Sequence, residues 1–175
     1  MAYYDTDGGA ESQLPQVSNL SDAFKHAITS ERGTPITPFG FKAENMTFVH
    51  SVHLATDDEA VYSYQYPVDH PFTKGHFPKN PVMMGVCQWQ MLEDAISDYV
   101  KRQNITTDSV TLNATLIKPD QTPVCDIKKA TMSILNNSDE IKVTTTSVKK
   151  VMFKQRVFPG DTLFVLISDI TKHSD

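Results

Sequence analysis

The sequence predicts an α+β protein in which an antiparallel sheet wraps around one helix. Two patterns in the 175 residues lead to this class. From Pro81 onward, apolar residues recur at helical spacing over most of the helix circumference, which predicts a buried helix of about 18–20 residues. Six or seven shorter runs, rich in β-branched and aromatic residues, predict strands before and after this helix in the sequence.

The segment before the long helix contains a polar stretch and several short elements. Residues 1–20 are predicted to form a flexible N-terminal tail, so that residues 21–175 make up a single predicted domain. Ser21 and Asp22 are suitable caps for a short amphipathic helix. The elements predicted here are a helix over 21–30, turns over 33–40, and strands over 46–54 and 61–66 that are joined by an acidic turn.

After the long helix the pattern returns to that of strands. The predicted strands cover residues 110–117, 124–135, 141–148, 151–158 and 162–170. Polar or glycine-containing turns separate them, at residues 136–139 and 159–161. Sequence patterns leave the order of these strands in the sheet open.

Composition excludes several classes of function. The formal net charge is −5 and no dense basic tract offsets it, which argues against nucleic-acid binding. Cys87 and Cys125 lack the spacing of a metal site, and no phosphate-binding or dinucleotide-binding motif is present, so no metal is expected. No signal peptide and no apolar run of membrane-spanning length is found, so we expect a cytoplasmic protein without a membrane span.

One histidine lies directly before the long helix. The segment reads Gly75-His76-Phe77-Pro78-Lys79-Asn80-Pro81-Val82-Met83-Met84-Gly85-Val86. The first turn of a helix has free backbone N–H groups and a partial positive charge, which stabilise an oxygen that gains negative charge. A histidine beside such donors is suited to removing a proton next to a carbonyl group.

A second motif, Val157-Phe158-Pro159-Gly160-Asp161, follows later in the chain. With these two motifs in this order, the chain resembles the hotdog-fold β-hydroxyacyl-[acyl carrier protein] dehydratases of fatty-acid and polyketide or polyene synthesis. The resemblance implies a hotdog fold, which is a curved antiparallel sheet wrapped around one long central helix. It also implies a dimer, either a homodimer or a heterodimer with a related hotdog subunit.

The resemblance further implies the chemistry of the site. His76 would remove the Cα proton of a 3-hydroxyacyl thioester, and the backbone N–H of Gly85 would hold the thioester oxygen. The acyl group would arrive on the phosphopantetheine of acyl carrier protein or coenzyme A, with no further cofactor. The residues expected to line the substrate tunnel are Phe77, Pro78, Val82, Met83, Met84, Val86 and Trp89.

The chain departs from the family at one important position. The family has a glutamate or aspartate fourteen residues after the histidine, and this chain has Gln90. An amide neither takes nor gives a proton at accessible pH, but it can orient a water molecule or a hydroxyl group. Gln90 is therefore interpreted as an orienting catalytic residue, as a relic of a degenerate site, or as a purely structural residue. Glu93 and Asp94 are interpreted as ordinary polar positions that could replace the carboxylate only if the histidine loop is displaced.

Three functions follow as hypotheses. The first is a dehydratase of 3-hydroxyacyl thioesters, acting alone or with a carboxylate from a partner subunit. The second is a hotdog thioesterase in which an amide holds the attacking water. The third is an acyl-carrier-protein-binding subunit without catalytic activity.

Overall fold

The computed structural model describes residues 20–29, 33–40, 42–71, 83, 85–137 and 140–174. The predicted N-terminal tail lies outside these ranges except for its last residue, Leu20, which is buried. Within the described ranges the chain forms two α-helices, one short 3₁₀ helix and seven strands. In chain order they are α1 (Asp22–Thr29), β1 (Thr34–Pro35), η1 (Glu44–Met46), β2 (Ser51–Ala55), β3 (Ala60–Gln65), α2 (Gly85–Arg102), β4 (Ser109–Ile117), β5 (Pro123–Asn136), β6 (Ile141–Phe153) and β7 (Thr162–His173).

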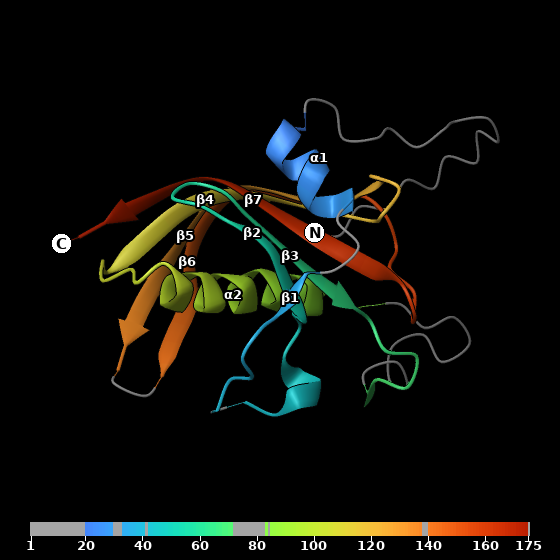
Figure 1. Ribbon diagram of the computed structural model, residues 1–175, viewed down its shortest axis with the longest axis horizontal. Coiled ribbons are helices and arrows are strands. Elements are labelled where there is room, and N and C mark those ends of the chain that lie inside the picture. Colours follow the sequence, from blue (N-terminus) through green and yellow to red (C-terminus); the bar gives the residue numbers. More distant parts are fainter. Residues whose placement is uncertain are drawn as a thin grey trace.

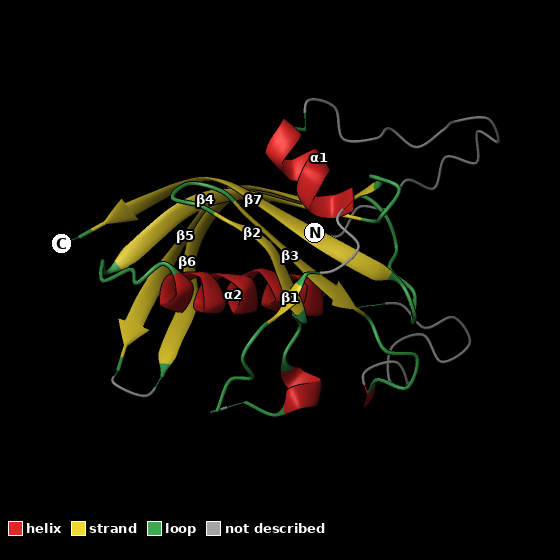
Figure 2. Cartoon of the chain, viewed as in Figure 1, coloured by secondary structure: helices red, strands yellow, loops and turns green. Residues whose placement is uncertain are grey.

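The seven strands form one sheet in the order β1-β2-β3-β7-β4-β5-β6, and every neighbouring pair is antiparallel. Figure 1 shows that the sheet curves over α2. In Figure 2, the same view coloured by secondary structure, the strands lie over this helix. The predicted α+β class is therefore confirmed, and this arrangement is compatible with a hotdog fold.

The main core lies between α2 and the concave face of the sheet. Spacing of three and four residues places one stripe of α2 against the strands. The fully buried apolar side chains of this stripe are Met91, Leu92, Ala95, Ile96 and Tyr99, and they form one cluster with side chains of β3, β4, β5 and β7. The helical spacing of the apolar residues in α2 is thus explained by packing on the sheet.

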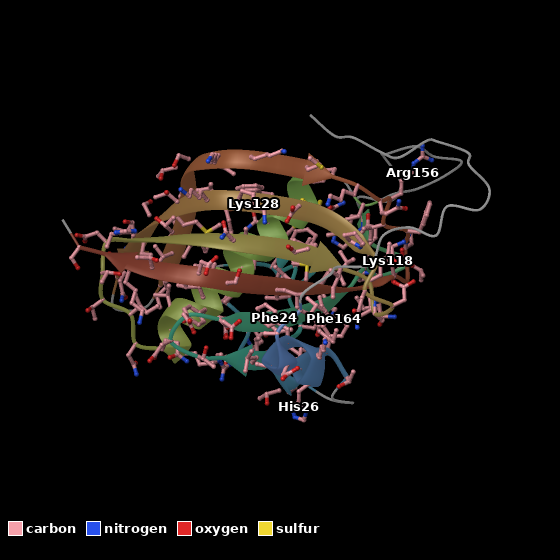
Figure 3. All side chains as sticks on the ribbon, turned by 90° about the horizontal axis from the view of Figure 1, so that it is seen from above. Phe24, His26, Lys118, Lys128, Arg156 and Phe164 are labelled. Atoms are coloured by element: carbon pink, nitrogen blue, oxygen red, sulfur yellow. The ribbon has the colours of Figure 1, made fainter. Side chains whose placement is uncertain are left out.

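A second, smaller core lies on the convex face of the sheet, where α1 packs. The side chains of Phe24 and Ala27 in α1 join Phe164 and Leu166 of β7 in one buried cluster, and Figure 3 shows Phe24 beside Phe164. Ser21 caps the helix, because its Oγ accepts a hydrogen bond from the backbone N–H of Phe24 at 3.1 Å. The predicted short helix and its serine cap are confirmed.

Asn113 of β4 forms hydrogen bonds with both neighbouring strands, β5 and β7, where the strand register shifts. The register of β4 shifts next to Asn113 against both β5 and β7. The Asn113 side chain donates to Asp169 Oδ2 at 2.8 Å and accepts from the backbone N–H of Lys129 at 2.9 Å. Asp169 and Lys129 both have positive φ. Since such bulges bend and twist strands, Asn113 stabilises the curvature of the sheet around α2.

The main differences from the sequence prediction concern the strands β1, β2 and β6. The strand predicted over 46–54 begins only at Ser51, because Met46 belongs to η1. The predicted turn region contains a short strand, β1, that pairs with β2. The strands predicted over 141–148 and 151–158 are one strand, β6, that ends at Phe153. The reason is that β5 is 14 residues long and provides ladder partners as far as Phe153, with no glycine or proline to interrupt β6.

His53 of β2 predicts a pH dependence of stability. Its Nε2 lies 2.8 Å from Ser63 Oγ, its Nδ1 is buried without a partner among the described residues, and burial lowers its pKa below the ordinary 6.5. The unfolded chain therefore binds more protons at His53, and stability is lost as the pH falls below about 6.5. In urea unfolding from pH 7.5 to 5, wild type should lose stability relative to His53→Gln. A difference between the two proteins that does not change with pH would contradict this expectation.

Candidate functional site

The two motifs of the sequence meet at the start of α2. The backbone N–H of Met83 donates to the carbonyl of Val157 at 2.7 Å. The N–H of Gly160 donates to the Tyr66 carbonyl at 2.6 Å, and the N–H of Tyr66 donates to the Asp161 carbonyl at 2.9 Å. Gly160 has φ of 92°, a conformation that glycine adopts without strain. The second motif thus fixes the end of β3 and the segment that leads into α2.

Gly85 is the first residue of α2 and lies against an aromatic ring. A Cβ atom at this position would lie 2.9 Å from Cζ of Phe153, at the end of β6. The first turn of α2 contains no acidic side chain, so the partial positive charge of the helix start is not neutralised there. The Gly85 position is therefore chemically suited to bind an oxygen that carries negative charge.

This close contact predicts an energetic coupling between Gly85 and Phe153. Gly85→Ala should be destabilising in wild type, because the ring has to move, and should be much better tolerated together with Phe153→Leu. A double-mutant cycle of urea unfolding should give a coupling of about 1 kcal/mol. The intrinsic helix preference of alanine is present in both backgrounds and cancels in the cycle. Additive effects would show that the ring does not limit this position.

Several predicted site residues lie outside the described ranges, namely His76, Phe77, Pro78, Val82 and Met84. The predicted site residues that lie inside the described ranges differ in their surroundings. Met83 is buried, whereas Val86 is 69% exposed on the outer face of α2. Trp89 is half-buried, and its Nε1 donates to Thr145 Oγ1 of β6 at 2.8 Å. The structure therefore brings Met83 together with the second motif and Gly85 together with Phe153, while Val86 points away from the core.

Gln90 is half-buried and is hydrogen-bonded to a buried carboxylate on the next turn of α2. Its Nε2 donates to Asp94 Oδ1 at 3.0 Å. Asp94 is 3% exposed and also accepts from Lys42 Nζ at 2.7 Å and from the backbone N–H of Phe48 at 2.8 Å. Burial raises the pKa of the Asp94 carboxyl, and the hydrogen bonds from Lys42 and Phe48 act in the opposite direction. Asp94 thus holds the segment before β2 against α2 and is not an ordinary polar position.

The other two carboxylates of α2 are also engaged in structural contacts. Glu93 Oε2 accepts from the backbone N–H and from Oγ1 of Thr145, at 2.9 and 2.7 Å, and so fastens β6 to the helix. Asp98 accepts from the Tyr62 hydroxyl at 2.6 Å and from Arg102 Nε at 3.0 Å. All three acids of α2 therefore have partners within the subunit.

Sequence reasoning missed two buried polar groups. Gln88 is 1% exposed, and neither Oε1 nor Nε2 of its side chain has a hydrogen-bond partner among the described residues. The hydroxyl of Tyr66 is buried and equally unpartnered there, and burial raises its pKa. One sequence signal was present for Gln88, since it lies four residues before Leu92 and seven before Ala95, in phase with the buried stripe.

A cavity of about 570 Å³ lies beside the segment that precedes His76 in the sequence. Its described lining includes Thr47, Tyr64, Pro67, His70 and Pro71. His70 is 2% exposed. Its Nε2 lies 2.7 Å from the Asn45 carbonyl, and its ring packs against those of Phe48 and Tyr66. His70 therefore connects η1 to the chain after β3.

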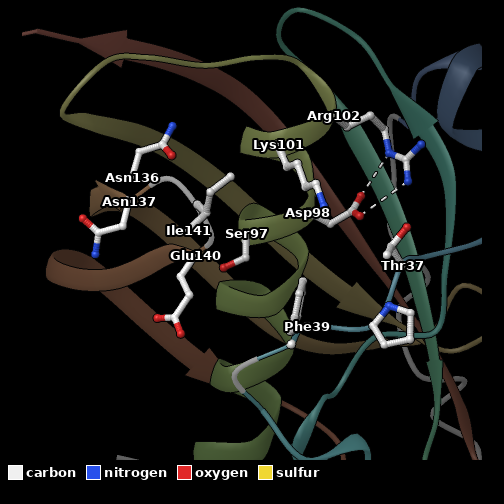
Figure 4. Close-up of a pocket in the computed structure, with 12 residues that line it drawn as sticks. Thr37, Phe39, Ser97, Asp98, Lys101, Arg102, Asn136, Asn137, Glu140 and Ile141 are labelled. Carbon is white, nitrogen blue, oxygen red and sulfur yellow. Dashed lines mark hydrogen bonds and ion pairs between the residues drawn. The ribbon is translucent and has the colours of Figure 1, made fainter.

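A second cavity of similar volume lies at the other end of α2 (Figure 4). It is lined by α2, by the segment after β1 and by the turn between β5 and β6, and the ion pair of Asp98 with Arg102 lies at its edge. No residue of either sequence motif is among its described lining residues. Throughout the described ranges, histidine, cysteine and acidic side chains form no group of three that could hold a metal ion.

Comparison with known proteins supports the resemblance to dehydratases that the sequence motifs indicate. Residues 52–135 match the ApeI-like family, described as ApeI dehydratase. The matched region runs from β2 through α2 into β5 and includes the positions of His76, Gly85 and Gln90. This similarity supports a place among the hotdog-type dehydratases and a dehydratase-type function. No curated protein matches the chain significantly. Within the described ranges, neither helix combines the length and apolar character needed to cross a membrane.

Proposed function

We propose that the protein is a dehydratase of 3-hydroxyacyl thioesters carried on acyl carrier protein. The similarity of residues 52–135 to the ApeI dehydratase family carries this proposal. Two features of the structure support it. The first turn of α2 contains no acidic side chain, which suits its backbone N–H groups to a polarised oxygen. The second sequence motif, around Gly160, is hydrogen-bonded next to this helix start.

In the proposed reaction, the neutral imidazole of His76 takes the Cα proton. The backbone N–H of Gly85 stabilises the charge that develops on the thioester oxygen. The electron pair then forms the Cα–Cβ double bond as the β-hydroxyl leaves. The proton held by His76 passes to the departing oxygen, so the thioester loses one water and consumes no other reagent. The Gln90 amide stays hydrogen-bonded to Asp94 through its Nε2 in this scheme.

The similarity to a dehydratase family favours dehydration over thioester hydrolysis. Each acid of α2 is already hydrogen-bonded within the subunit. A single histidine can serve both proton transfers of a dehydration. If a carboxylate takes part, we propose that a related hotdog subunit supplies it in a heterodimer. Without such a partner, we propose a homodimer.

Product analysis distinguishes the candidate functions. The full chain is incubated with a 3-hydroxyoctanoyl thioester of acyl carrier protein or of N-acetylcysteamine, alone and with candidate hotdog partners. A dehydratase should form the trans-2-enoyl thioester and release no free thiol. Release of thiol with an unchanged acyl chain would instead identify a thioesterase. Recovery of unchanged thioester in all mixtures would leave acyl binding as the function and reject dehydration.

A further inference from the structure

We propose that Gln88 is a substrate-binding residue that recognises the 3-hydroxyacyl group through both ends of its side-chain amide. This assignment rests on the proposed function and adds a residue to the site. Gln88 shares the sheet-facing stripe of α2 with Leu92, Ala95 and Tyr99, all of which are completely buried. Helical side chains lean toward the N-terminus of their helix, so the amide of Gln88 points back toward the turn that begins at Gly85.

The amide of Gln88 is unusual in having no partner at either end. Buried side-chain amides in folded proteins are nearly always hydrogen-bonded, because removing them from water without compensation is costly. Gln88 is 1% exposed, and both of its polar atoms lack partners among the described residues. Leucine or methionine would fill such a position at lower cost. A glutamine here is explained by a bound group that supplies the missing partners.

The required ligand has one hydrogen-bond acceptor and one donor close together. The amide offers a donor at Nε2 and an acceptor at Oε1. A 3-hydroxyacyl thioester carries a carbonyl oxygen that accepts and, on the carbon two positions away, a hydroxyl that donates. The carbonyl pairs with Nε2 and the hydroxyl with Oε1. A saturated acyl thioester has only the carbonyl and leaves Oε1 buried without a partner.

Gln88 and Gln90 have different roles in this arrangement. Two residues apart on a helix, their side chains point about 200° apart around its axis. Gln90 donates to Asp94 and is half-buried, whereas Gln88 faces the sheet and is bound to nothing among the described residues. Gln88 thus selects the hydroxylated acyl group from within the subunit.

Binding measurements test this role independently of turnover. Dissociation constants are measured by calorimetry for 3-hydroxyoctanoyl-N-acetylcysteamine and octanoyl-N-acetylcysteamine, in a His76→Gln background so that neither compound is consumed. The hydroxylated thioester should bind about tenfold more tightly. Adding Gln88→Leu should abolish this preference by weakening only the hydroxylated ligand, without lowering the melting temperature. Gln88→Met serves the same purpose if the leucine variant folds poorly, and Met91→Leu, a neighbouring buried substitution, should keep the preference.

The outcomes separate this inference from the proposed function. A preference that survives in Gln88→Leu and Gln88→Met means that Gln88 holds an internal water only, and it overturns the inference. Equal binding of both thioesters to the parent protein, or no binding of either, overturns it as well. Loss of the preference in both Gln88 variants supports the inference. It does so even if wild-type protein forms no enoyl thioester, a result that would reject dehydration alone.

Discussion

Asp94→Ala is expected to destabilise the protein by about 3 kcal/mol. The substitution removes a buried carboxylate that accepts hydrogen bonds from Lys42, Phe48 and Gln90. It leaves a buried backbone N–H at Phe48 without its acceptor and a largely buried ammonium group at Lys42 without its counter-ion. Urea unfolding followed by circular dichroism measures the change in unfolding free energy.

Two further variants make this expectation specific. Asp94→Asn keeps an oxygen acceptor for Phe48, so it should lose less stability than Asp94→Ala. Asp57→Ala, at an exposed turn between β2 and β3, should change the unfolding free energy by less than about 0.5 kcal/mol. If Asp94→Ala is as stable as Asp57→Ala, the carboxylate does not fasten the segment before β2 to α2.

His76→Gln is expected to lower the rate of enoyl thioester formation by about 10²- to 10⁴-fold. Glutamine can form hydrogen bonds but cannot accept the Cα proton, so the loss should appear mainly in kcat. The rate is measured under saturating 3-hydroxyoctanoyl thioester, together with the melting temperature of the variant.

His26→Gln is the matched control for this substitution. His26 is exposed on α1, on the convex face of the sheet and away from α2 (Figure 3). Its replacement should leave the rate unchanged. Equal activity of the His76→Gln variant and wild type would remove His76 from the reaction, and the proposed chemistry would need another base.

Hydrophobic periodicity predicted the elements of the fold well where one face is buried. The stripe of α2 that contains Leu92 and Ile96 and the alternation in β4 are both set by packing on one core. The prediction failed for β6. Five consecutive residues of this edge strand, 146–150, are exposed on both faces, so alternation does not mark its length. Its continuity depends instead on the length of β5, which is a long-range property.

The candidate site was only partly predictable, because sequence motifs identify residue types and not their partners. The proximity of Met83 and Val157 could be expected from two motifs that resemble those of one family. The hydrogen bonds from Thr145 to Glu93 could not be predicted. They join residues 52 positions apart in the sequence, and Thr145 lies at a register shift between β5 and β6. Gln88 is in phase with the buried stripe, but a single polar residue in such a stripe resembles an ordinary interruption. Its burial without a partner among the described residues distinguishes it.

Deuterium incorporation tests the central claim most directly. The full chain is incubated in D₂O with a trans-2-octenoyl thioester, so that the reaction runs in the direction of hydration. If the imidazole of His76 handles the proton at Cα, the 3-hydroxyoctanoyl product should carry deuterium at Cα, and the His76→Gln variant should form far less of it. Hydration at the wild-type rate in the His76→Gln variant, or cleavage of the thioester without any deuterium at Cα, would contradict the account.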